Sequence, residues 1–216
     1  MRSALQDLQQ QPVRWMLRFL HLNLGLMVFG LSISMMLSAS VGLGPWDVFH
    51  EGLSIRTPLT IGQAMILAGL ALIAVSALIA GTRPGVGTVA NMAFIGLWVD
   101  AFLLLPGFPH FDGGVGGWTW FVAGVVLNGV ATGLYITAGL GAGPRDGFAL
   151  ALAKKLRTSV QRARSLVEIV VLASGWALGG TVGLGTLVFA VLIGPLMQLG
   201  LRWTKPLARM HGPVDP

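Results

Sequence analysis

Long apolar segments separated by short polar ones recur along the whole chain of 216 residues. Each apolar segment has about 20 residues, the length with which an α-helix crosses roughly 30 Å of hydrocarbon. A backbone in lipid must satisfy its own hydrogen bonds, so helices are the expected form. The pattern predicts an all-α polytopic membrane protein with six spans, near Met16–Ser40, Leu59–Ala80, Val86–Leu105, Trp118–Ala138, Gln161–Gly180 and Leu184–Leu201.

The composition supports a membrane location. Hydrophobic residues make up 54% of the chain and charged residues 10%, against roughly 25% charged residues in ordinary soluble domains. So few charges cannot cover a water-exposed surface. We therefore expect one membrane domain over residues 1–216, with polar tails at 1–13 and 204–216. The chain has no cysteine, which excludes disulfides, thiol catalysis and cysteine-ligated metals.

The basic residues predict the orientation. If the N-terminus lies in the cytoplasm, every Lys and Arg except Arg56 falls on the cytoplasmic side, as the positive-inside rule requires. Both termini are then cytoplasmic. The net charge is +6, and most of the positive charge flanks the apolar spans, where orientation in a membrane explains it, so we expect no nucleic-acid binding. The cytoplasmic loop that carries Arg157, Arg162 and Arg164 could also contact anionic lipid.

A short motif occurs twice, 99 residues apart. The run Gly42-Leu-Gly-Pro-Trp-Asp47 matches Gly141-Ala-Gly-Pro-Arg-Asp146. The match continues along both halves in order, and it predicts two repeats near residues 16–107 and 118–203. Three spans per repeat is an odd number, so the second repeat enters the membrane from the opposite side. We therefore expect inverted repeats, an inference that depends on the count of six spans.

The motif predicts that a helix ends and a short one begins. Its glycines, Gly42, Gly44, Gly141 and Gly143, permit tight backbone turns. Pro45 and Pro144 suit the first turn of a new helix, because proline lacks the N–H that would be unsatisfied there. The expected short helices are Pro45–Ser54 and Pro144–Leu156, which lie on the bilayer surface or enter it as re-entrant segments.

Interrupted helices at matching positions of two repeats point to the substrate site of a transporter. The candidates for substrate binding or coupling are Asp47, Asp146, Asp100, Glu51, His50 and Asn91. Blander explanations stay open for several of them. Asp47 and Asp146 could simply cap surface helices, Asp47, His50 and Glu51 could form a solvated loop cluster, and Asp100 could lie at the outer interface. For Glu168, four residues after Arg164, a helical ion pair is the simplest account.

No pattern of residues indicates an enzyme. The four histidines show no metal-ligand spacing, and the chain has neither a nucleophile elbow nor a phosphate-binding loop. We therefore expect no catalytic activity, no metal and no cofactor. Gly129 and Gly133 are four residues apart and predict a close helix approach that serves internal packing.

The motifs resemble a known family. The run Gly42-Leu-Gly-Pro-Trp-Asp-Val-Phe-His-Glu-Gly-Leu-Ser54 resembles the signature of the bacterial YczE/YitT-type membrane proteins, as do Arg83-Pro-Gly-Val-Gly-Thr-Val-Ala-Asn91 and Gly141-Ala-Gly-Pro-Arg-Asp-Gly147. The resemblance covers roughly residues 20–200. It implies a protein of the bacterial cytoplasmic membrane whose biochemical function is unknown, and it adds no substrate.

Two hypotheses for the function follow. The leading one is a small secondary transporter or permease for a small solute or ion, with its site between the repeats. The alternative is a non-transporting sensor, regulator or assembly factor that acts through the basic cytoplasmic loop. The substrate, the coupling ion and the oligomeric state stay open at this stage.

Overall fold

The computed structural model describes residues 11–81, 83–141 and 143–210. These residues form eight helices and no strand. Most of the expected N-terminal tail and the last part of the C-terminal tail lie outside the described residues. The helices are α2 (Pro12–Leu37), α3 (Pro45–Arg56), α4 (Ile61–Ala80), α5 (Val86–Leu103), α6 (Gly114–Thr137), α7 (Pro144–Leu156), α8 (Val160–Ala177) and α9 (Leu184–Met210).

The helices coincide with the expected segments. The six expected spans correspond to α2, α4, α5, α6, α8 and α9, and the two expected short helices correspond to α3 and α7. Of the described helices, α2, α4, α5, α6 and α9 are long and apolar enough to cross a membrane. Helix α8 is less apolar, because Arg162, Arg164 and Glu168 lie within its 18 residues. Five spans are therefore supported, and the sixth stays a prediction.

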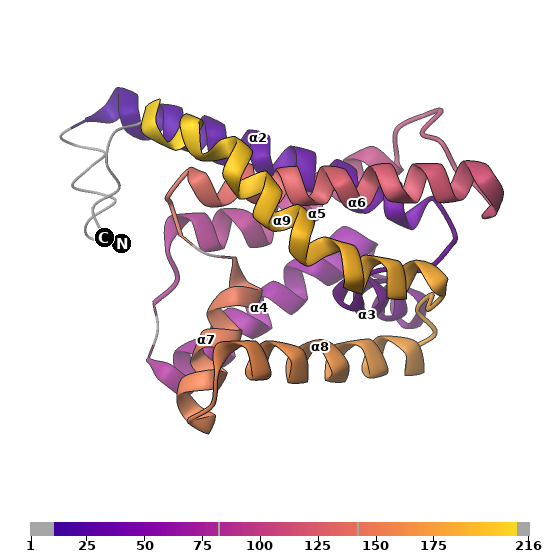
Figure 1. Ribbon diagram of the computed structural model, residues 1–216. Coiled ribbons are helices and arrows are strands. Elements are labelled where there is room, and N and C mark those ends of the chain that lie inside the picture. The colour runs from indigo at the N-terminus through magenta and orange to yellow at the C-terminus, as the bar shows by residue number, and fades with distance from the viewer. Residues whose placement is uncertain (1–10, 82, 142, 211–216) are drawn as a thin grey trace.

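The helices form two groups that lie one above the other in Figure 1. In the first group, α6 contacts α2 and α9, and α2 contacts α5. In the second group, α3 contacts α4 and α8, and α7 contacts the same two helices. Contacts of α5 with α4 and α7 join the groups. The start of α2 and the end of α9 lie at the same end of the molecule (Figure 1).

Apolar side chains fill the centre of the first group and also cover much of the outside. Leu26, Phe121 and Val125 are fully buried between α2 and its neighbours. Large apolar side chains such as Ile169 on α8 and Val191 on α9 are exposed. In a membrane this outer surface contacts lipid, so its exposure carries no hydrophobic penalty.

Helices α6 and α9 cross at glycines. A Cβ atom on Gly200 of α9 would meet the backbone carbonyl of Gly129, and one on Gly133 would meet the backbone of Gly200. The expected close approach at Gly129 and Gly133 is thus confirmed as an internal contact. Without a hydrophobic driving force between helices in lipid, such close backbone packing supplies much of the attraction.

Asp100 fixes the start of α4. One of its carboxylate oxygens accepts a hydrogen bond from Thr60 Oγ1 at 2.5 Å, and the other accepts one from the backbone N–H of Gly62 at 2.8 Å. Thr60 also accepts from the N–H of Gln63, which completes a capping box. Asp100 therefore satisfies helix N-terminal donors that would otherwise lack a partner.

The glycine crossing predicts the effect of one added methyl group. Gly200→Ala should destabilise the protein by about 1–3 kcal/mol, because the crossing helices must separate to accept a Cβ atom. Gly194→Ala is the matched control on the same helix, since a Cβ atom there has no neighbour within 4 Å. The measurement is the melting temperature in detergent. An equal effect of the two changes would contradict the packing that we describe.

The cap predicts a loss of stability on removal of the Asp100 carboxylate. Asp100→Ala should cost about 1–2 kcal/mol, as the loss of a helix cap does elsewhere. Asp112→Ala provides the control, because Asp112 is an exposed aspartate outside the helices. Thermal unfolding monitored by circular dichroism compares the two variants. Stability of Asp100→Ala equal to that of the control would show that the cap contributes nothing.

Candidate functional site

A cavity of about 190 Å³ lies between the two groups of helices, and every described helix contributes to its lining. Both copies of the repeated motif reach it. Pro45 and Asp47 come from the first turn of α3, and Pro144 and Asp146 come from the first turn of α7. The starts of the two short helices therefore face one space.

The same long-range hydrogen bond holds each copy of the motif. The N–H of Gly185 donates to the carbonyl of Val41, and the N–H of Gly87 donates to the carbonyl of Leu140, each at 2.8 Å. Val41 and Leu140 precede the two copies of the motif at matching positions. Each bond ties the segment before a short helix to the first turn of α9 or α5.

The glycines of the motif turn the chain back into the bundle. Gly42 and Gly141 have φ of 116° and 126°, values that side-chain-bearing residues rarely adopt. Gly44 then lies against the ring of Phe189, and Gly143 lies against the side chain of Asn91. Phe189 lies five residues after the first residue of α9, and Asn91 lies five residues after the first residue of α5. Five residues correspond to about 7.5 Å along a helix. Helix α3 thus begins beside the second turn of α9, and helix α7 begins beside the second turn of α5, so both short helices start within the bundle.

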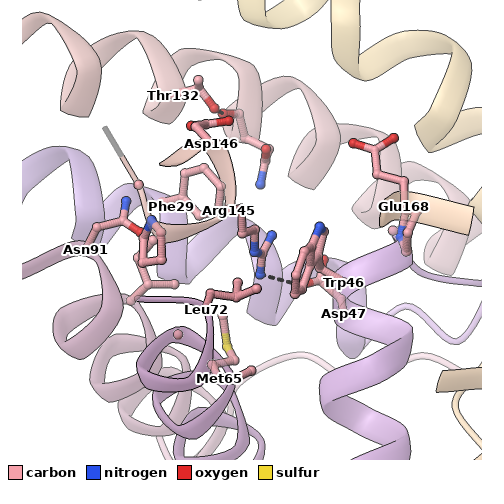
Figure 2. A pocket seen from close by; sticks show the side chains of 18 of the residues that line it. Phe29, Trp46, Asp47, Met65, Leu72, Asn91, Thr132, Arg145, Asp146 and Glu168 are labelled. Carbon is pink, nitrogen blue, oxygen red and sulfur yellow. Dashed lines mark hydrogen bonds and ion pairs between the residues drawn. The ribbon is translucent and has the colours of Figure 1, made fainter. Parts of the chain in front are cut away.

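Asp47 of the first copy faces Arg145 of the second. Arg145 Nη2 lies 4.0 Å from Asp47 Oδ1, and its guanidinium lies over the ring of Trp46, 4.9 Å from the centroid. Figure 2 shows the Arg145 side chain directed toward Trp46 and Asp47. His50, one turn along α3, places its Nδ1 3.9 Å from the same Asp47 oxygen. Charges from both copies therefore meet at one point.

This meeting point leaves polar atoms without hydrogen bonds. Asp47 is 5% exposed and His50 is 2% exposed. Asp47 Oδ1 and His50 Nδ1 are buried and have no hydrogen-bond partner among the described residues. Buried carboxylates and imidazoles are normally hydrogen-bonded, because an unmatched polar atom costs free energy. Buried polar atoms without a partner beside a cavity indicate a candidate functional site.

A second polar cluster lies across the cavity and is internally paired. Tyr135 Oη donates to Asp146 Oδ2 at 3.4 Å, and Arg164 Nη1 lies 3.5 Å from Asp146 Oδ1. Arg164 Nε donates to Glu168 Oε1 at 3.0 Å, so the expected helical ion pair is confirmed. All three basic residues expected at anionic lipid, Arg157, Arg162 and Arg164, are exposed, and Arg164 is also paired within this cluster.

The six candidates from the sequence fall into two sets. Asp47, His50, Asp146 and Asn91 line the cavity. Asp100 and Glu51 do not: Asp100 caps α4, and Glu51 Oε2 accepts a hydrogen bond from the N–H of Thr181 at 2.5 Å. These two carboxylates thus have structural partners.

Among the polar residues that line the cavity, the sequence did not single out Trp46, Arg145, Thr132 and Tyr135 as site candidates. Trp46 and Arg145 occupy the variable position of the motif, which the repeat alignment gives no reason to single out. In the described ranges no group of three or more His, Asp and Glu could hold a metal ion.

Most of the chain matches a known protein family. Residues 16–202 match a family described as Family of unknown function (DUF6198). No solved structure matches the chain.

Three relatives cover most of the chain. The "Uncharacterized membrane protein YczE" of Bacillus subtilis (strain 168) is 34% identical over 89% of this chain and 87% of its own length. An "Uncharacterized protein" of Haemophilus influenzae is 34% identical over 82% of this chain and 79% of its own length. The "Uncharacterized protein YyaS" of Bacillus subtilis is 23% identical over 90% of this chain and 96% of its own length.

These matches support the YczE part of the resemblance, whereas the YitT part stays a prediction. A membrane-protein relative and long apolar helices together identify a multi-pass membrane protein that contacts the lipid bilayer. The chain belongs to the family of unknown function DUF6198 and is a membrane protein of the YczE type.

Proposed function

We propose that the protein is a small secondary transporter or permease of the bacterial cytoplasmic membrane for a small solute or ion. One observation carries the proposal: both copies of the repeated helix break contribute the first turn of a short helix to one central cavity. Interrupted helices that meet near the middle of a membrane form the substrate sites of several transporter folds.

The packing supports two inverted repeats. The repeat pairs α3 with α7 and α4 with α8, and the contact of α3 with α8 has its counterpart in the contact of α4 with α7. The two backbone hydrogen bonds, from Gly185 to Val41 and from Gly87 to Leu140, are related in the same way. In this proposal the first repeat has α2, α4 and α5 as spans, and the second has α6, α8 and α9.

Helix α8 must then serve as the sixth span despite its charges. Intramembrane charges are tolerated where they face the bundle interior and have partners. Arg164 and Glu168 pair with each other, and Arg164 also lies close to Asp146. Arg162 lies near the start of α8, where its side chain can reach the cytoplasmic interface. Both termini are then cytoplasmic.

In this topology α3 enters the membrane from the outside and α7 from the inside. Both are re-entrant helices, and their N-terminal ends carry partial positive charge toward the cavity. Asp47 belongs to one repeat and Arg145 to the other, so rocking of one repeat against the other changes their separation. Such rocking around a fixed site is the usual form of alternating access.

The alternative is a non-transporting sensor, regulator or assembly factor. Its support is the exposed basic segment at the end of α7 and the start of α8, which includes Lys154, Lys155, Arg157 and Arg162. Such a segment suits contact with an acidic partner or anionic lipid. It does not explain the buried charges at the cavity, so we rank it second.

Two-sided access to the cavity distinguishes transport from sensing. The chain has no cysteine, so single cysteines can be introduced at Ala68 of α4 and Ala190 of α9, which line the cavity. A membrane-impermeant maleimide should label each of them in right-side-out and in inside-out vesicles. Alternating access requires this result, because each side reaches the site in turn.

Three further cysteines serve as controls. Leu187→Cys on the lipid-facing side of α9 should stay unlabelled from both sides. Asp112→Cys should react only from outside and Ser159→Cys only from the cytoplasm, as the proposed orientation requires. Labelling of both cavity positions from a single side would contradict transport and favour the sensor.

A further inference from the structure

The groups of the cavity differ in how completely they are paired. Arg164, Glu168, Asp146 and Tyr135 interact with one another. Asp47 has an oxygen with no hydrogen bond, and Arg145 donates none to any described residue. Besides His50 Nδ1, the open groups are therefore one buried acceptor and one set of guanidinium donors, and these two groups lie side by side.

The separation of these two groups is too long for a direct hydrogen bond. Arg145 Nη2 and Asp47 Oδ1 are 4.0 Å apart, whereas charged N–H to oxygen bonds measure about 2.7–2.9 Å. Their attraction holds them near each other and leaves the hydrogen-bonding capacity of each unfilled. A ligand that offers both an N–H donor and an oxygen acceptor would fill both at once.

The surroundings favour a carboxylate at Arg145. Guanidinium forms paired hydrogen bonds with a planar carboxylate, and the Trp46 ring beneath Arg145 helps to fix its plane. The starts of α3 and α7 also point into the cavity. The partial positive charge of these helix ends adds to the attraction for an anionic group.

Asp47, whose Oδ1 lies 4.0 Å from Arg145 Nη2, favours a cationic group. Its buried Oδ1 needs a donor, and a cationic N–H group supplies both the hydrogen bond and the compensating charge. His50 Nδ1, also without a partner, lies 3.9 Å from that oxygen and can take part in the same contact. A simple anion would leave Asp47 unmatched, and a simple cation would leave Arg145 unmatched.

Many of the other residues of the wall are apolar, beside Asn91 and the paired polar cluster around Asp146. Met65 and Leu72 of α4, Ile95 of α5, and Phe189 and Ile193 of α9 line the same cavity. These side chains suit a hydrocarbon body. The space of about 190 Å³ suits a small molecule.

We propose that this cavity binds a small zwitterion with an apolar side chain, its carboxylate at Arg145 and its ammonium group at Asp47. An apolar α-amino acid has this chemistry. The inference rests on the proposed transport function for its biological meaning, because it names the substrate class of that site. The binding itself can be tested without any assay of transport.

The test compares probes that share a side chain and differ in charge. Glycine, alanine, leucine and phenylalanine are each compared with the corresponding deaminated acid and decarboxylated amine, for example leucine with 4-methylpentanoate and 3-methylbutylamine. The purified full-length protein is melted with each probe at equal concentration, and a ligand of the native state raises the melting temperature. We expect leucine or phenylalanine to raise the melting temperature more than glycine does. Each should also raise it more than its own deaminated acid or its own decarboxylated amine does.

Variants then locate the site. Asp47→Asn and Arg145→Gln should each weaken binding of the best amino acid roughly tenfold to a hundredfold, because each removes a charged hydrogen-bond partner. Asp112→Asn and Arg162→Gln are exposed controls and should bind normally. Melting without a probe shows whether each variant folds, and the comparison of probes on the unmodified protein decides the ligand class even if a variant does not.

Several results would overturn the proposal. One is an acid or an amine that stabilises the protein as well as the corresponding amino acid does. Another is no shift in melting temperature with any amino acid of the series. A third is weakening of amino-acid binding in the exposed control variants equal to that in Asp47→Asn and Arg145→Gln. Failure of the proposed transport function looks different: cavity cysteines then react from one side only, whatever the probes do. Zwitterion binding with one-sided access would indicate a receptor, and two-sided access without zwitterion binding would indicate a transporter of another substrate class.

Discussion

A helix can be interrupted inside a membrane protein only where other protein groups satisfy the backbone atoms that the break exposes. This constraint shapes the structure. The segments before α3 and α7 run back into the bundle, and each is held by a backbone hydrogen bond from a neighbouring long helix, Gly185 to Val41 and Gly87 to Leu140. Removal of these bonds would leave the buried turns with unmatched carbonyls, and the first turns of both short helices would lose their position at the cavity.

Two kinds of carboxylate result from this arrangement. Asp100 and Glu51 both accept hydrogen bonds from backbone N–H groups: Asp100 caps α4, and Glu51 holds the connection between α8 and α9 at Thr181. Asp47 is equally close to a helix start, yet its Oδ1 has no hydrogen bond within the described chain and faces a cation from the other half. Proteins keep unmatched buried charges mainly where function requires them. This difference in pairing is our reason to place the ligand at Asp47.

Much of the fold could be predicted from the sequence because apolar periodicity and span length follow directly from the bilayer. The helix starts at Pro45 and Pro144 were likewise visible in the motif. The sequence could not show that α3 and α7 begin beside Phe189 and Asn91, since that depends on packing between distant segments. For the same reason Arg145 was overlooked, because its partner Asp47 lies 98 residues away and only the tertiary structure brings them together.

The central claim is that the two copies of the motif face each other, and a double-mutant cycle between Asp47 and Arg145 tests it most directly. The free energy of unfolding is measured for the unmodified protein, Asp47→Asn, Arg145→Gln and the double variant. Contact between the residues predicts non-additive changes with a coupling of about 0.5–3 kcal/mol. The pair Asp47→Asn and Arg162→Gln should be additive, as expected for distant groups. Additivity in both pairs would contradict a shared site built from the two copies.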